Sequence, residues 1–134
     1  MRQALLDTNI LSYFLKGEPK VVNKVNDYLQ HHSYLTISIF TYYETKRGLL
    51  YRDASSQMEQ FEQLVEISDI VSFSEEVADT ASNIYSQLRQ KGALIASLDL
   101  LIGATAVYHN YLLITANVKH FKNMPGLQYE NWIA

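Results

Sequence analysis

Short apolar segments alternate with helix-like segments along the whole 134-residue chain, and this alternation limits the possible folds more than any other feature. The first unit begins with Leu5-Leu6, which predicts a short buried strand. Asp7-Thr8-Asn9 follows with three residues that favour helix N-caps, and residues 10–15 then predict a helix. Strands that alternate with helices are typical of a mostly parallel sheet between layers of helices. The sequence therefore predicts an α/β fold.

The remaining segments follow the same order, without an internal repeat, a linker or a low-complexity tract. Residues 112–115 carry no polar alternation, which is typical of a strand covered on both faces. Ser74 is a good N-cap for the helix that Gly92 ends. We expect one domain over residues 1–134. Further strands are expected at residues 34–38, 67–73, 112–115 and 128–130, and further helices at residues 19–32, 39–51, 54–66, between Ser74 and Gly92, and at residues 98–109.

The composition is that of a globular protein, with 48% hydrophobic and 19% charged residues. The absence of cysteine excludes disulfides and thiolate metal sites. The first residues lack the apolar core of a signal peptide, and no apolar run approaches the roughly 18 residues of a membrane span. The net charge of −3 argues against broad, non-specific nucleic-acid binding but allows a local basic patch. We expect a cytoplasmic protein with no membrane partner.

Acidic residues lie at three of the predicted junctions between a strand and a helix. Asp7 follows the first strand, Glu44 lies in the helix after the second strand, and Asp99 lies in the first turn of an apolar helix. Asn117 adds an amide just after the last strong strand. Because ligands of open α/β sheets bind outside the carboxyl ends of the strands, we expect these four side chains to converge.

Each of the four residues also has an ordinary structural explanation. Asp7 suits an N-cap, and a mid-helix Glu44 suits a solvated helix face. Asp99 suits the positive end of a helix dipole, and Asn117 suits a turn or a cap. The helix of Asp99 is otherwise so apolar that we expect it to be buried nearly all round. A buried carboxylate is unfavourable unless a cation or hydrogen-bond donors satisfy it.

Clustered carboxylates repel one another, so a site of this composition requires a cation. Oxygen ligands select a hard metal ion, which here means Mg²⁺ or Mn²⁺. Such an ion polarises a phosphoryl oxygen and activates a water for hydrolysis. The acidic residues therefore point to metal-dependent phosphodiester chemistry.

The order of these motifs resembles that of the PIN-domain ribonucleases of the VapC toxin type. The resemblance extends over essentially the whole sequence, and it is specific because all the short motifs occur in the family's order. The matching segments are Leu5–Leu11, Ser38–Leu49, Asp99–Ala106, Thr115–Phe121, Pro125–Leu127 and Glu130–Trp132.

The resemblance implies a PIN-like three-layer α/β/α sandwich with a central, mostly parallel sheet. It also implies metal-dependent endonucleolytic cleavage of RNA to a 5′-phosphate and a 3′-hydroxyl, by a toxin that dimerises and is inhibited by a cognate antitoxin. Asp7, Glu44 and Asp99 fall on the family's three strongest acidic positions. Asn117 takes the polar position of the last motif, and Lys119-His120 stands where many relatives carry a fourth acid. We expect these three acids and Asn117 to be catalytic, with one metal site of three carboxylates.

Other residues near the motifs are candidates for supporting roles. Thr8 and Ser38 would orient the carboxylates or a water. Lys46, Arg47 and Lys119 would form a basic rim around the acidic centre and contact the RNA backbone. The ten tyrosines suit interfaces, including that of a homodimer.

Other classes of protein also place an acid at the end of a strand. A receiver domain needs a paired acid after the first strand, and a haloacid-dehalogenase-type phosphatase needs a second Asp where Asn9 stands. A nucleotide-binding domain needs a Gly-rich loop after the first strand, and no glycine lies there. A non-catalytic RNA- or protein-binding PIN-like module, with the acids as caps and surface groups, remains the alternative. A metal-dependent cleavage assay separates it from a nuclease.

Overall fold

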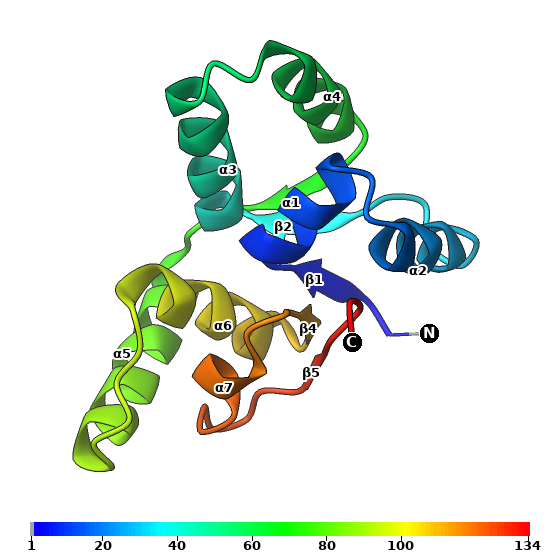
Figure 1. Cartoon of the computed structure of the whole chain (residues 1–134). Coiled ribbons are helices and arrows are strands. Elements are labelled where there is room, and N and C mark those ends of the chain that lie inside the picture. Colours follow the sequence, from blue (N-terminus) through cyan, green and yellow to red (C-terminus); the bar gives the residue numbers. More distant parts are fainter. Residues whose placement is uncertain (1) are drawn as a thin grey trace.

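The computed structural model describes residues 2–134, and within that range it contains five strands and seven helices (Figure 1). None of the helices in this range is both long and apolar enough to cross a membrane. The strands are β1 (Ala4–Leu6), β2 (Thr36–Ser38), β3 (Asp69–Val71), β4 (Leu112–Ile114) and β5 (Tyr129–Glu130). The helices are α1 (Thr8–Leu15), α2 (Pro19–Leu29), α3 (Ile39–Tyr51), α4 (Ser55–Glu66), α5 (Glu75–Gln90), α6 (Ser97–His109) and α7 (Val118–Phe121).

β1 lies at the centre of a sheet with the order β3-β2-β1-β4-β5, in which every pair of neighbours is parallel. Leu5 is in register with Thr36 of β2 on one side and with Leu113 of β4 on the other. The chain adds β2 and β3 outward from one side of β1, and then returns to add β4 and β5 on the other side. This reversal makes the carboxyl ends of β1 and β4 a topological switch point, where open α/β sheets bind ligands.

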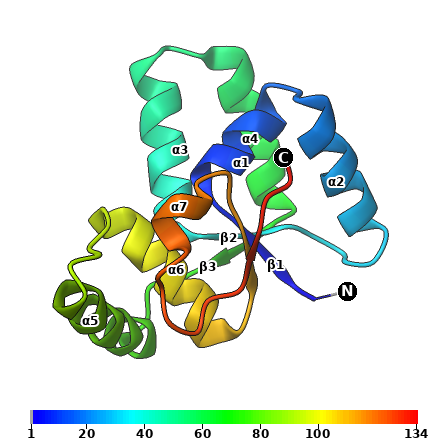
Figure 2. The same cartoon turned by 60° about the horizontal axis from the view of Figure 1, so that its bottom comes forward.

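Alternate residues of β1 face opposite layers of helices. Ala4 and Leu6 pack with buried side chains of α1, α2, α3 and α4, whereas Leu5 packs with those of α5, α6 and α7. Figures 1 and 2 show these two groups of helices on opposite sides of the sheet. The expected α/β/α sandwich with a central parallel sheet is confirmed.

Several boundaries differ from the sequence prediction. α2 ends at Leu29 with Gln30 as its C-cap, so the predicted extension to residue 32 is wrong. β2 begins at Thr36, two residues after the predicted start. It ends at Ser38 as predicted, where the Ser38 side chain accepts a hydrogen bond from Thr41 N–H and so begins α3. α7 was missed because a single turn of four residues shows no helical periodicity, although buried Phe121 anchors it.

α6 is the apolar helix that carries Asp99, and most of its residues from Leu100 to Ala106 are buried. Gly103 allows it to pack closely on the segment that follows α7. A Cβ atom at Gly103 would overlap the Met124 side chain and lie 3.3 Å from Cε1 of Phe121. The glycine therefore lets α6 approach α7, which places Asp99 beside the residues that follow β4.

Candidate active site at the carboxyl edge of the sheet

Asp7 is the residue at which β1 ends and α1 begins. Its backbone N–H donates to the carbonyl of Ile114 at 2.9 Å, which continues the pairing with β4. Its Oδ1 accepts a 3.0 Å hydrogen bond from Ile10 N–H, so Asp7 is the N-cap of α1. The residue is only 4% exposed, which is unusual for an aspartate that needs only to cap a helix.

The surroundings of Asp7 disfavour its charged form. Burial raises the pKa of the Asp7 carboxyl from 3.8 to about 6, although hydrogen bonds from the Thr115 hydroxyl and from Ile10 N–H oppose the shift. The negative charge of Asp99 raises the same pKa further. This repulsion indicates that Asp7 and Asp99 belong to one electrostatic environment, although they lie 92 residues apart in the chain (99 − 7).

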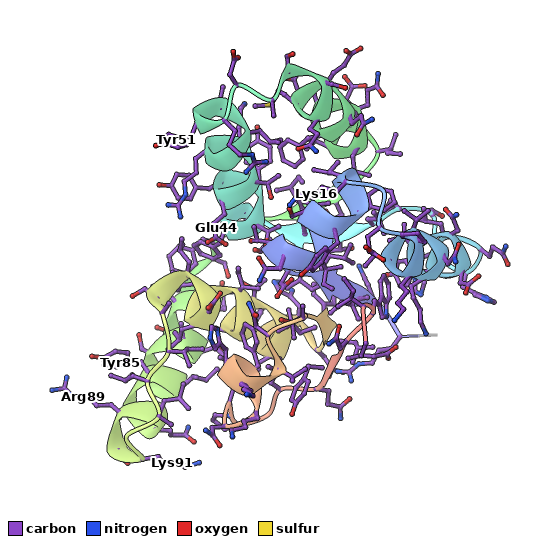
Figure 3. All side chains as sticks on the ribbon, in the orientation of Figure 1. Lys16, Glu44, Tyr51, Tyr85, Arg89 and Lys91 are labelled. Atoms are coloured by element: carbon purple, nitrogen blue, oxygen red, sulfur yellow. The ribbon has the colours of Figure 1, made fainter. Side chains whose placement is uncertain are left out.

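Glu44 is held by a hydroxyl network that joins the ends of β1 and β2. Thr8 Oγ1 donates to Oε1 of Glu44 at 2.6 Å and lies 3.3 Å from Oγ1 of Thr41. Thr41 Oγ1 lies 3.5 Å from Oγ of Ser38, the N-cap of α3. Figure 3 shows Glu44 on the part of α3 that approaches α6. The structure thus places Thr8 in contact with Glu44 directly and connects Ser38 through Thr41, which the sequence pattern did not single out.

Asp99 lies in the first turn of α6 and contacts α7. Its Oδ2 is 3.2 Å from Nδ1 of His120, and its side chain is 26% exposed. The sequence singled out His120 only as a departure from the family's fourth acid, and its contact with Asp99 depends on α7, which the sequence did not predict. The pairing joins the first turn of α6 to α7, the helix that follows β4.

Asn117 occupies the N-cap position of α7. Within residues 2–134, its side chain makes no capping hydrogen bond to that helix. Its backbone N–H donates to Thr115 Oγ1 at 3.0 Å. The Thr115 hydroxyl in turn donates to the Asp7 carboxylate, so Thr115 links Asn117 to Asp7. Sequence reasoning missed Thr115. A hydroxyl residue directly after the apolar run 112–114 was the signal that could have identified it, and the structure buries this side chain fully.

Asp7, Glu44, Asp99 and Asn117 therefore gather at one edge of the sheet. The three carboxylates among them do not form a compact cluster. Within residues 2–134, no three His, Asp or Glu side chains lie close enough together to hold a metal ion. Asp7 is linked to Asp99 by its electrostatics, and Glu44 is linked to the start of α1 by the Thr8 hydrogen bond.

The basic residues predicted to contact RNA lie on α3 and α7. Lys46 Nζ is 3.2 Å from the hydroxyl of Tyr42, and Arg47 Nη1 is 3.2 Å from the hydroxyl of Tyr43. Arg47 also approaches Glu44, with Nη2 3.9 Å from Oε2. Lys119 is exposed on α7. Lys46 and Arg47 lie on α3, which carries Glu44, and Lys119 lies on α7, which carries the His120 partner of Asp99.

Known proteins resemble this chain along almost its full length. The PIN domain family model matches residues 4–127. Ribonuclease VapC2 of Rickettsia felis is 31% identical over 132 residues, and the alignment covers 96% of each protein. The tRNA(fMet)-specific endonuclease VapC of Shigella flexneri is 26% identical, and the alignment covers 98% of this chain and 99% of that protein.

A solved structure shares the whole fold. The crystal structure of VapBC2 from Rickettsia felis, bound to a DNA fragment from its promoter, superposes with a TM-score of 0.87 at 28% identity. The match covers 96% of this chain and 98% of that chain. The family model, the relatives and the shared fold agree with one another: the chain belongs to the PIN-domain family and, within it, to the VapC-type ribonucleases.

Proposed function

We propose that this protein is an endoribonuclease that hydrolyses RNA phosphodiester bonds as the toxin of a toxin–antitoxin pair, with residues 1–134 acting as a single PIN-like nuclease domain. The relatives named as ribonuclease and endonuclease match nearly the whole chain. The observation that carries the proposal is the buried Asp7 carboxylate at the switch point, with Asp99 acting on it. RNA in the cytoplasm is the substrate that we assign to this site.

The donor set fits a hard divalent cation, Mg²⁺ or Mn²⁺. Asp7, Glu44 and Asp99 offer only carboxylate oxygens, the ligands that these ions prefer. Asp7 is destabilised in its charged form by burial and by Asp99, and a cation beside it would remove that unfavourable energy. The Glu44 and Asp99 side chains are 20% and 26% exposed, so neither carboxylate is closed off from a cation that arrives from solvent. We assign these three residues as the metal ligands.

A bound cation of this kind would polarise the scissile phosphoryl group and lower the pKa of the attacking water. The protein's own residues orient the reacting groups. Thr8 fixes one oxygen of Glu44, and Thr115 fixes the Asp7 carboxylate. His120 orients Asp99, and Asn117 offers its amide to the phosphate or the water at the end of β4. Lys46, Arg47 and Lys119 would hold neighbouring phosphates.

The experiment compares cleavage of RNA by the wild type, by Asp99→Asn and by Asp79→Asn, in which a surface carboxylate of α5 is changed as a matched control. We expect the wild type and Asp79→Asn to cleave RNA with Mg²⁺ or Mn²⁺ and to stop in chelator. Asp99→Asn should lose cleavage but keep its fold, because the substitution removes one ligand charge and no buried volume.

The melting temperatures in chelator separate catalysis from folding. Asp99→Asn should melt at the wild-type temperature or above, because carboxylate repulsion is relieved. Equal cleavage by Asp99→Asn and the wild type, or undiminished cleavage in chelator, would refute the metal mechanism. RNA binding without cleavage under any metal condition would instead assign the non-catalytic module.

We also propose two protein partners, a cognate antitoxin and a second copy of this chain. The structure of VapBC2 from Rickettsia felis supports the antitoxin. Phe73, Tyr85 and Leu94 are 48%, 43% and 47% exposed. These side chains support both contacts, because association with a partner would cover their exposed apolar surface. Sedimentation of the purified chain at micromolar concentration should give a dimer or a larger species. A clean monomer would count against the homodimer.

A further inference from the structure

A small polar cavity opens beside the proposed active site, between α1, α3 and the start of α4. Its volume is about 190 Å³. Thr8 and Glu44 form part of its wall, so it is continuous with the acidic edge of the sheet. The other polar residues of the lining are Asn9, Ser12, Thr45, Arg52 and Gln57.

Thr45 is the first sign that this cavity accepts a ligand. The residue is 7% exposed, and within residues 2–134 its Oγ1 has no hydrogen-bond partner. Buried hydroxyls in proteins are nearly always paired, so an unpaired hydroxyl on a cavity wall requires an explanation. The Oγ1 atom itself has almost no accessible surface, so a polar group in the cavity would become its partner once the Thr45 side chain turns toward the cavity.

Arg52 is the second sign that this cavity accepts a ligand. It caps the end of α3, and its side chain folds back over Gly48, where a Cβ atom would lie 3.5 Å from Nη1. Glycine lowers the stability of a helix when it lies in the middle. At position 48 the absence of a side chain leaves this surface of α3 open to the Arg52 side chain and to a ligand in the cavity. Nη2 lies 3.5 Å from Oε1 of Gln57, a long contact that leaves the guanidinium donors available.

The charges around the cavity favour a nucleobase over a phosphate. Glu44 contributes a carboxylate to the wall, and that carboxylate would repel an anion. A guanine base instead presents two acceptors, O6 and N7, which pair with the fork of an arginine. Its N–H donors would meet the side-chain oxygens of Thr45 and Gln57.

We propose that this cavity binds a guanine base of the RNA, one nucleotide from the scissile phosphate, and that Arg52 recognises it. The inference rests on the proposed ribonuclease function for its substrate, and it adds a sequence preference to that function. Single-stranded RNA is commonly recognised in this way, through bases that are splayed out and hydrogen-bonded along their edges.

Binding is measured first, without catalysis. The full chain is titrated in chelator with 5′-GMP, 5′-AMP, 5′-CMP, 5′-UMP and inorganic phosphate, and the backbone amides of Gly48 and Thr45 are followed by NMR. We expect 5′-GMP to bind about tenfold more tightly than the other nucleotides, which is the discrimination of one bidentate arginine–guanine pair. Equal shifts with inorganic phosphate would overturn the proposal in favour of an anion site. No saturable shift with any probe would also overturn it.

Variants assign the recognition to Arg52. Arg52→Gln should abolish the preference for 5′-GMP, and Arg52→Lys should do the same because lysine keeps the charge but loses the planar fork. Thr45→Val should weaken 5′-GMP binding without adding volume. Arg89→Gln is the matched control, since Arg89 lies on α5 at a distance from Glu44 (Figure 3), and it should bind 5′-GMP like the wild type. Preference for 5′-GMP that survives both Arg52 variants would overturn the role of Arg52.

Cleavage of a randomised single-stranded RNA then separates this inference from the proposed function. The wild type should prefer guanine beside the cut by about tenfold, and Arg52→Lys should cleave without that preference. Cleavage by the wild type with no preference for guanine would overturn the cavity assignment and leave the ribonuclease intact. Preferential 5′-GMP binding with no cleavage would overturn the ribonuclease and leave the guanine site intact.

Discussion

Thr8 donates a 2.6 Å hydrogen bond from its hydroxyl to Oε1 of Glu44. The bond joins the first residue of α1 to the second turn of α3, so it fixes the relative positions of two helices that begin at neighbouring strands. It also leaves Oε2 of Glu44 as the oxygen with more freedom, since its ion pair with Arg47 is a longer contact of 3.9 Å. Glu44 is therefore oriented before any substrate arrives.

Replacing Thr8 by valine tests this orientation. Valine keeps the shape of the side chain but cannot donate to Glu44, so Thr8→Val should lower kcat/KM for RNA by about 10- to 100-fold, the usual loss when a metal ligand loses its hydrogen-bonding partner. The Mg²⁺ concentration that gives half-maximal rate should rise in parallel. Thr8→Ser is the matched control, because it keeps the hydroxyl and should retain most activity. A fully active Thr8→Val protein would show that the bond does not support catalysis.

The buried Asp7 carboxyl should make the metal-free protein less stable as pH rises. Its folded-state pKa of about 6 lies above the ordinary aspartate pKa of 3.8, so between these two pH values the folded protein holds more protons than the unfolded chain. The free energy of unfolding should fall by about 3 kcal/mol across this window and stay level above it, given a shift of about 2 pKa units.

Asp7→Asn isolates this effect, because asparagine caps helices as well as aspartate and does not titrate. Urea unfolding in chelator should give similar stability for the two proteins near pH 4, with Asp7→Asn more stable by about 3 kcal/mol near pH 7. If the free energies of unfolding of the two proteins changed in parallel with pH, burial would not disfavour the charged form of Asp7 in the folded state.

Two glycines in helices should respond oppositely to substitution by alanine. Gly103→Ala should destabilise the protein by about 1 kcal/mol, because overlap with buried Met124 outweighs the gain in helix propensity. Gly48→Ala should stabilise it by up to about 1 kcal/mol, because the new Cβ makes an ordinary contact with Arg52. Chemical unfolding of the two variants measures both effects.

A Met124→Ala background serves as the control for this pair. The space left by Met124 should accept the extra methyl group, so Gly103→Ala should no longer destabilise the protein there. A Gly103→Ala variant as stable as Gly48→Ala would refute the close approach of α6 to the segment after α7.

Lys119 should contribute to RNA affinity through a phosphate. Lys119→Gln should weaken binding of single-stranded RNA in chelator and reduce the slope of log K against log salt by about 0.7, the value for one phosphate contact on a single strand. Arg89→Gln removes a charge from α5 and should leave the slope unchanged. Fluorescence anisotropy over a series of salt concentrations gives both values. An unchanged slope for Lys119→Gln would remove this residue from the basic rim.

Local patterns in the sequence were sufficient for much of the fold. The run Leu5-Leu6 before Asp7 located β1 and the start of α1, and Ser74 located the start of α5. Capping groups and hydrophobic periodicity act over a few residues, so they can be read without knowledge of the tertiary structure. The positions of Asp7 after β1 and of Glu44 in the helix after β2 followed from the same signals. The expected strand-to-helix junction at Asp99 is wrong, because α6 follows α5 and not a strand.

The tertiary structure alone decided which distant groups meet. The contact of Asp99 with His120 and the link from Asn117 through Thr115 to Asp7 depend on β4 pairing with β1 rather than with β3. The raised pKa of Asp7 and the unpaired Thr45 likewise arise from burial by segments far apart in the chain. Strand order and helix packing follow from the sum of many weak contacts between distant residues, and no local pattern of residues specifies that sum.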